Sequence, residues 1–460
     1  MRRGAHLTRS GGSAALHTPR HAPHRSGQHA RPEQATSGGA MKFRRRIFVV
    51  GGAHTTYIGK HHPDFIWKKH PDFGERENPT LEEFLGEAVQ KAFENTGVSP
   101  DAIEKGYVGN FAGELFVNQG HLGSLLARVA PGLEKKPIGR TEAACASGGI
   151  AVTACIDALN AGHDVVLAAG AEVQTSVNAR AGADYLARAS HYATERQIDE
   201  FTFPCLFARR AKAYKEAYGV TDEDIAHTVV KAYSNANKNP YAHMRAVSMT
   251  LEHASNAGPK NPNFLQNEAY RDHLKITDCS QVSDGASAVI LATEEGLAKL
   301  GVKPEDCVEI LSYGHATSGL GNVEELTRLS NAEAAAATAY ADAGIEASDI
   351  QIAEVHDCFS ITELMMMEAL GFAEPGKAAE RVKNGDTAIT GDLPINTGGG
   401  LVAFGHPVGA TGIKQVLEIF RQMKKQCGDY QVPRDLTYGL TANMGGDDRT
   451  TVVMTYRNVQ

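Results

Sequence analysis

The sequence predicts an α/β fold built of two similar βα halves with a mostly helical insertion between them. The first observation is an internal repeat: a helix ending at Gly97, then a short turn and a strand, recurs 247 residues later with a helix ending at Gly344. The second is a pair of glycine-rich turns, near residues 145 and 405, each followed by a long apolar helical pattern. The third is a polar stretch at about 173–275 without strand–helix alternation.

Local signals justify the elements of the first half. Lys42–Gly51 has the pattern of a first strand, and Thr80 is expected to cap a helix that runs through about Asn95. Gly97 then provides a left-handed end for that helix. Further strands are expected at 107–109 and 164–171, and residues 276–291 are expected to form a turn followed by a strand.

The second half shows the same kinds of pattern. After the helix that ends at Gly344, a strand is expected at 352–355. A second long helix follows the glycine-rich turn and covers about 412–426. The last strand-like run is 450–455.

Composition and charge exclude several classes of protein. The 460 residues suffice for two or three domains, with 42% apolar and 22% charged side chains. No apolar run approaches the ~18 residues of a membrane span. Seven cysteines without a Cys-x-x-Cys pair favour a reducing compartment and disfavour a disulfide framework or a zinc cluster. Beyond residue 40 the chain carries 40 basic and 53 acidic side chains, a net charge of −13, which disfavours nucleic acid as a partner.

Residues 1–40 are interpreted as a disordered leader. They hold six arginines and a single acid, Glu33, and show no hydrophobic periodicity. They resemble an acid-poor organelle transit peptide; the alternative is a mis-assigned start, with Met41 as the true first residue. We therefore expect a cytoplasmic protein, or a mitochondrial matrix protein if the leader is real. The C-terminal residues 458–460 are not a peroxisomal address.

A cysteine among small residues is the first candidate catalytic residue. Cys145 lies in Glu-Ala-Ala-Cys-Ala-Ser-Gly-Gly, and an apolar helical pattern begins directly after it. The unpaired N–H groups of the first helical turn are expected to lower the pKa of this thiol and favour the thiolate. The alternative is a small buried cysteine that packs like alanine.

Two histidine motifs lie two hundred residues further on. One is Glu354-Val-His356-Asp-Cys358-Phe, directly after a predicted strand, and the other is Gly405-His406-Pro-Val-Gly-Ala-Thr-Gly. Strand ends and glycine-rich turns are where ligands and nucleophiles gather in α/β proteins. A thiolate needs a base, and carbon–carbon bond formation at a thioester needs a second base and donors for the developing negative charge. Taken singly, a histidine in such a position is more often structural than catalytic.

These motifs, in this order, resemble the thiolase superfamily over about residues 44–457. The His-Asp-Cys-Phe form is similar to the sterol-carrier-protein-2-type thiolases, which include acetyl-CoA acetyltransferases and 3-ketoacyl-CoA thiolases. The resemblance implies the thiolase fold, five layers in the order αβαβα made of two repeated halves with a helical loop domain. We place the N-terminal half at 41–172 and 276–297, the loop domain at 173–275 and the C-terminal half at 298–460.

The resemblance also implies roles for the site residues. Cys145 is acylated, His406 activates it, and Cys358 moves the proton at the substrate α-carbon. His356 and His406 form one oxyanion site, and the N–H groups of Cys145 and Gly445 form the other. No metal is implied.

One departure from the family concerns the C-terminal motif. Most thiolases carry Cys-x-Gly where this chain has Asn443-Met-Gly445, and asparagine is no acid or base at neutral pH. In the sterol-carrier type the cysteine of His-Asp-Cys-Phe takes that role, which by resemblance falls to Cys358.

The resemblance implies coenzyme A or acyl-CoA as substrate and no permanently bound cofactor. Ser280 matches a family position that lines the pantetheine channel. Because coenzyme A is anionic, cations are expected at the channel mouth, with solvated surface charge as the alternative; the candidates are Arg209, Arg210 and Lys212.

The implied function is acyl transfer through a cysteine thioester: thiolysis of 3-oxoacyl-CoA, as in fatty acid β-oxidation, Claisen condensation of acetyl-CoA, or both. One alternative is a decarboxylating condensing enzyme, but the His-Gly-Thr-Gly-Thr turn usual in ketoacyl synthases is absent. Another is a catalytically silent lipid-binding or scaffold relative, although known examples lose the cysteine kept here. Family resemblance implies a homodimer or a dimer of dimers, and in some relatives an acyl-CoA-binding zinc-ribbon partner.

Overall fold

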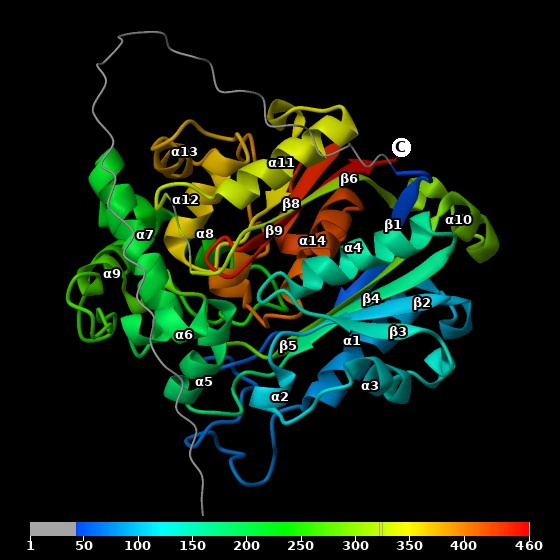
Figure 1. Ribbon diagram of the computed structural model, residues 1–460, viewed down its shortest axis with the longest axis horizontal. Helices are drawn as coiled ribbons and strands as arrows, with labels where there is room; N and C mark the ends of the chain where they lie inside the picture. The colour runs from blue at the N-terminus through cyan, green and yellow to red at the C-terminus, as the bar shows by residue number, and fades with distance from the viewer. Residues whose placement is uncertain (1–42, 322, 324, 460) are drawn as a thin grey trace, which may run out of the picture. The chain divides into compact units, whose positions relative to one another are not determined.

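A single nine-stranded sheet runs through the protein (Figure 1). The computed structural model describes residues 43–459 except 322 and 324, so the predicted leader, 1–40, lies outside the described residues. The strand order is β3-β2-β4-β5-β1-β6-β9-β8-β7. The strands are β1 (Ile47–His54), β2 (Lys105–Gly109), β3 (Ile138–Thr141), β4 (Val165–Glu172), β5 (Gly285–Thr293), β6 (Val308–Thr317), β7 (Ile352–Glu354), β8 (Tyr438–Gly445) and β9 (Thr450–Asn458).

The strand order contains the predicted duplication. β1 and β6 pair antiparallel at the centre, and each is flanked by the last strand of its own half, β5 or β9. Beyond these, β2 pairs parallel with β4, as β7 does with β8. A parallel bridge between Ala353 and Ile395 takes the place that the β2–β3 pair has in the first half. The second half therefore repeats the first.

The two halves of the sheet form two layers, and helices lie between them and outside them, which gives the five-layer order αβαβα. α4 (Ser147–Asn160) and α14 (Thr411–Met423) pack against each other and form the central layer, in contact with strands of both halves (Figure 1). α1 (Leu81–Thr96) and α3 (Leu122–Val129) cover the outer face of the first half, and α11 (Ser330–Ala343) covers the second. The predicted fold class is confirmed.

The stretch between β4 and β5 is helical and groups on one side of Figure 1, in green. Its helices are α5 (Ala179–Leu186), α6 (Tyr192–Glu195), α7 (Thr202–Tyr218), α8 (Asp222–Ala236) and α9 (Leu251–Ser255). The other short helices are α2 (Gly113–Phe116), α10 (Glu294–Leu300), α12 (Ser360–Ala369) and α13 (Ala378–Lys383). Among residues 43–459 with their two gaps, no helix has the length and apolar character needed to cross a membrane. The domain boundaries stay a prediction.

Local signals fix the ends of the matching helices α1 and α11. Thr80 caps α1 in a reciprocal box with Glu83, each side chain accepting a hydrogen bond from the other's backbone N–H. Gly97 and Gly344 end α1 and α11 with φ of 68° at each, in the left-handed region that glycine adopts without steric cost.

The N-termini of α4 and α14 meet at a contact between glycines. A Cβ on Gly148 would lie 2.8 Å from the carbonyl oxygen of Gly409, and one on Gly412 would lie 2.2 Å from the backbone nitrogen of Gly149. These are backbone atoms that cannot move aside cheaply. Glycine at both turns therefore brings the loop of Cys145 and the loop of His406 together.

A buried carboxylate at the end of β4 holds the loop of His406 in place. Glu172 accepts hydrogen bonds from the backbone N–H groups of Phe111, Ala112 and Gly409 at 2.9, 3.1 and 3.1 Å. Burial raises the pKa of Glu172 to about 7, although these N–H groups lower it. One side chain thus ties the segment after β2 to the loop that carries His406.

We expect Gly412→Ala to destabilise the fold by about 1–3 kcal/mol, because the added methyl group meets the backbone of α4. The matched control is Gly258→Ala, where a Cβ has no atom within 4 Å and φ is not in the left-handed region. Urea unfolding of both variants tests this. Equal unfolding midpoints for the two would show that the glycine contact does not constrain the structure.

Candidate active site

Cys145 lies in a tight turn between β3 and α4. Ala144 has φ of +49°, unusual for a residue with a side chain, and its N–H donates to the Glu142 carboxylate at 2.6 Å. The Ser147 hydroxyl donates to the Ala144 carbonyl at 2.6 Å and accepts from the Ala143 N–H at 3.0 Å. These bonds fix the turn and leave the thiol at the N-terminus of α4.

His356 and Cys358 lie in the loop directly after β7. The Asp357 carboxylate accepts the N–H of Leu401 at 2.6 Å, which joins this loop to the glycine-rich segment before His406. The Cys358 carbonyl accepts the N–H of Ser280 at 2.9 Å. Ser280 therefore lies beside the predicted acid–base cysteine, and its role toward coenzyme A stays a prediction.

His406 is anchored on both backbone and ring. Its N–H donates to the Ser283 hydroxyl at 3.2 Å, and its carbonyl accepts from the Gln174 amide at 2.9 Å. Its Nδ1 lies 2.7 Å from the Thr411 hydroxyl. Among the residues that the structure describes, the buried Nε2 of His406 has no hydrogen-bond partner.

The structure brings the predicted side chains together. The sulfur of Cys145 and one nitrogen each from His356 and His406 lie within 4.8 Å of one another, and the imidazole rings meet edge-on with centroids 5.2 Å apart. Cys358 is close enough that charge on Cys145 raises its pKa. All four side chains are buried. A thiol, two imidazoles and a second thiol from distant segments thus share one site.

The electrostatics correct one expectation from sequence. Burial raises the pKa of Cys145 to about 12, while N–H groups of Gly446 and of Cys145 itself lower it to a smaller extent. A helix N-terminus alone therefore does not give a resting thiolate. Besides the N–H of Cys145 itself, the N–H of Gly446 acts on the sulfur, one residue beyond the predicted Gly445, whose oxyanion role stays a prediction.

The histidines are correspondingly neutral. Burial lowers the pKa of His406 to about 3 and holds the pKa of His356 well below its ordinary value. Burial also raises the pKa of the Cys358 thiol. The resting site contains two thiols and two neutral imidazoles, so a thiolate forms only when a proton moves to a neighbouring group.

Asn443, at the end of β8, is a site residue to which no role is assigned from sequence. Its amide oxygen accepts the N–H of Gly149 at 3.0 Å. Its amide nitrogen lies 3.1 Å from the Cys145 carbonyl oxygen and 3.2 Å from Nδ1 of His356. The departure from Cys-x-Gly is the signal that marks this position.

The three cations predicted at the channel mouth differ in their burial and in their partners. Arg210 is fully buried, pairs with Asp447 and donates to the carbonyl of Arg328 at 2.9 Å, so it is a structural ion pair and not a channel-mouth cation. Arg209 approaches the same carboxylate at 3.4 Å. Lys212 lies over the Tyr270 ring.

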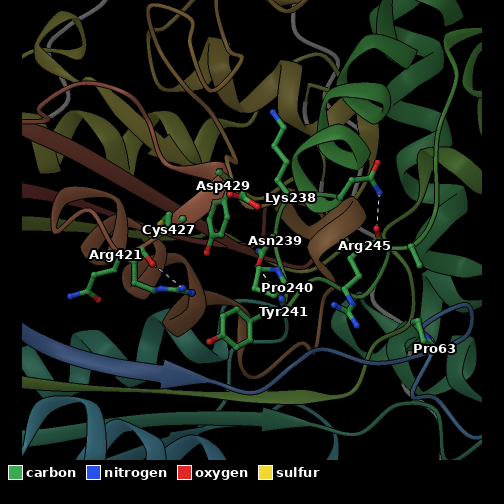
Figure 2. A pocket seen from close by; sticks show the side chains of 14 residues that line it. Pro63, Lys238, Asn239, Pro240, Tyr241, Arg245, Arg421, Cys427 and Asp429 are labelled. Carbon is green, nitrogen blue, oxygen red and sulfur yellow. Dashed lines mark hydrogen bonds between the residues drawn. The ribbon is translucent and has the colours of Figure 1, made fainter.

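A cavity of about 640 Å³ lies elsewhere, around the C-terminal end of α14. Figure 2 shows Lys238, Arg245 and Arg421 among the side chains that line it. None of its lining residues is a predicted site residue, and the Arg421 guanidinium already pairs with Glu418 at 3.4 Å. This cavity is separate from the cysteine–histidine site.

Comparisons with known proteins agree with the geometry. The family model "Thiolase, N-terminal domain" matches residues 72–295, and "Thiolase C-terminal domain-like" matches 312–458. The chain is 40% identical to an acetyl-CoA acetyltransferase of Methanocaldococcus jannaschii, over 80% of this chain and 91% of the relative. It is 37% identical to the enzyme of that name from Methanothermobacter thermautotrophicus, over 81% and 94%.

More distant relatives support the same fold. Sterol carrier protein 2 of Gallus gallus is 29% identical over 88% of this chain and 70% of its own length. The solved structure of human mitochondrial 3-ketoacyl-CoA thiolase has a TM-score of 0.63 at 17% identity, over 90% of this chain and 99% of that one. The Ltp2-ChsH2(DUF35) aldolase structure has a TM-score of 0.70 at 22% identity, over 90% and 98%.

The low pKa of His406 predicts an acid-sensitive fold. Below about pH 6.5 the unfolded chain protonates this histidine while the folded chain does not, so its contribution to stability is lost as the pH falls toward 3. In His406→Gln that dependence is removed, and the melting temperature should fall less steeply between pH 6.5 and 4 than in the wild type. Parallel curves for the two proteins would contradict the buried neutral imidazole.

Proposed function

The chain belongs to the thiolase family of acyltransferases, and from this premise we propose that it moves acyl groups between coenzyme A thioesters with Cys145 as the carrier. The observation that supports this most is the meeting of the Cys145 sulfur with the His356 and His406 nitrogens within 4.8 Å. The name of the archaeal relatives, acetyl-CoA acetyltransferase, favours acetyl-CoA as one substrate. Coenzyme A is a substrate in this proposal and not a resident cofactor.

The first half-reaction is acyl transfer to the protein. The Cys145 proton moves to Nε2 of His406, and the sulfur attacks the thioester carbonyl. The carbon–sulfur bond to coenzyme A breaks, and the leaving thiolate takes the proton of Cys358. Imidazolium at His406, the His356 ring and backbone N–H groups near Cys145 stabilise the oxyanion.

The second half-reaction makes the carbon–carbon bond. The Cys358 thiolate takes a proton from the α-carbon of a second acetyl-CoA, and the enolate attacks the acyl group on Cys145. The bond to Cys145 breaks, and its sulfur recovers the proton held by His406. The reverse sequence is thiolysis of a 3-oxoacyl-CoA.

The two alternative functions lack specific support. A decarboxylating condensing enzyme has the same nucleophile but usually a different histidine turn, and a silent lipid-binding relative has no need of a nucleophile beside a base. A dimer, a zinc-ribbon partner, a role in β-oxidation and a cytoplasmic location belong to this proposal as well. The proposal also includes Ser280 as a residue that lines the pantetheine channel and the N–H group of Gly445 as an oxyanion donor.

Cys145→Ala should abolish formation of the acyl-enzyme, because the carrier sulfur is absent. Intact-mass and peptide mass spectrometry after incubation with acetyl-CoA should find an added acetyl group on Cys145 in the wild type and none in the variant. The matched control is Cys155→Ala, which removes a buried thiol two turns along α4 and should leave the adduct unchanged. An adduct on another residue, or none in the wild type, would contradict the proposal.

Cys358→Ala should separate the two half-reactions. The Cys358 thiolate is needed to take the α-proton, so condensation and thiolysis should fall by about 10²–10⁴-fold. Acetylation of Cys145 should persist at a reduced rate, since His406 still takes its proton. The assay is single-turnover acetylation beside steady-state thiolysis of short, long and branched 3-oxoacyl-CoA. Equal losses in both steps would argue against a separate role for Cys358.

A further inference from the structure

We propose that Asn443 is a positioning residue that holds His356 in the tautomer opposite to that of His406, so that His356 donates a hydrogen bond to the substrate while His406 accepts the Cys145 proton. This inference rests on the proposed function and extends it to a residue that replaces the family's usual cysteine.

The orientation of the Asn443 amide is fixed by two backbone groups. Its oxygen faces the N–H of Gly149, which can only donate, and its nitrogen faces the carbonyl of Cys145, which can only accept. A flipped amide would oppose donor to donor and acceptor to acceptor. The side chain is buried, and Gly412 leaves room for it, since a Cβ there would lie 2.3 Å from its oxygen.

This orientation determines the tautomer of His356. The Asn443 amide nitrogen carries two hydrogens and no acceptor, so the hydrogen not used on Cys145 points to Nδ1 of His356 at 3.2 Å. Nδ1 must therefore accept, which leaves the single proton of the neutral ring on Nε2. Burial and the neighbouring His406 lower the pKa of His356 and keep that ring neutral.

His406 has the opposite arrangement. We assign the single Thr411 hydroxyl proton to the Pro407 carbonyl, 3.1 Å away, so that the hydroxyl oxygen is an acceptor 2.7 Å from Nδ1 of His406. The proton of this ring then lies on Nδ1. Its Nε2 carries a lone pair and, among the described residues, has no hydrogen-bond partner, as a base for the Cys145 thiol requires.

The two tautomers give the two histidines different roles in the reaction. Nε2 of His406 receives the Cys145 proton, and Nε2–H of His356 donates to the oxygen that gathers charge. Opposite tautomers also disfavour a metal. A thiol with two imidazoles suits zinc, but a protonated Nε2 cannot coordinate, so Asn443 makes His356 a hydrogen-bond donor rather than a ligand.

Neutron diffraction from deuterated wild-type crystals tests the assignment directly. We expect deuterium on Nε2 of His356 and on Nδ1 of His406. Deuterium on Nδ1 of His356, or on both of its nitrogens, overturns the inference. The map does not depend on turnover, so it distinguishes a wrong tautomer from a wrong function, which the acetylation of Cys145 reports separately.

Asn443→Asp reverses the preference of His356, because a carboxylate accepts from Nδ1–H and leaves Nε2 bare. We expect kcat for thiolysis to fall by about 10²–10³-fold with little change in KM. We also expect zinc to bind about 10–100-fold more tightly than to the wild type, by titration calorimetry with zinc chloride, since a carboxylate behind a ligating histidine strengthens the site.

The matched control is Asn239→Asp. Asn239 is equally buried, and its amide donates to the Gly398 carbonyl at 3.0 Å and accepts the Tyr241 N–H at 3.0 Å, outside the site. Its zinc affinity and its KM should match those of the wild type. Zinc affinity unchanged in Asn443→Asp, measured below the unfolding temperature of each variant, would contradict a tautomer switch and leave Asn443 a merely structural residue.

Discussion

The contact between the N-termini of α4 and α14 is the constraint on which the site depends. Each helix follows a glycine-rich turn, and Gly148 and Gly412 allow the two backbones to approach more closely than any side chain permits. Cys145 ends one turn and His406 lies in the other. The duplication of the fold therefore supplies the active site, because the two central helices are equivalent elements of the two halves and meet with their N-termini together.

Burial then determines the protonation states of the side chains at this site. Burial penalises every charged form, so the pKa of the Cys145 thiol rises to about 12 and the pKa of His406 falls to about 3. A standing ion pair is disfavoured, and charge forms only with the substrate in place. The same low dielectric strengthens each N–H directed at the developing oxyanion. Glu172 fixes the backbone around the site by accepting the N–H of Gly409.

Much of the fold could be predicted because its signals are local. The Thr80 cap, the glycines at 97 and 344, and the apolar strands β4, β5 and β9 are encoded within a few residues. Three strands are not predicted from the sequence. β3 has only four residues, and β8 contains two glycines as well as polar residues. β6 forms the central pair with β1, and pairing between the two halves leaves no local pattern. The site residues followed from motifs, whereas the contacts of Asn443 and the ion pair of Arg210 depend on partners hundreds of residues away.

The central claim is that Cys145 carries the acyl group inside this buried cluster. A crystal structure of the protein soaked with acetyl-CoA tests it most directly. The account predicts an acetyl group on the Cys145 sulfur, with its carbonyl oxygen facing backbone N–H groups at the start of α4 and the end of β8. Electron density for acetyl on Cys358 or on a residue outside the cluster, with an unmodified Cys145, would contradict it.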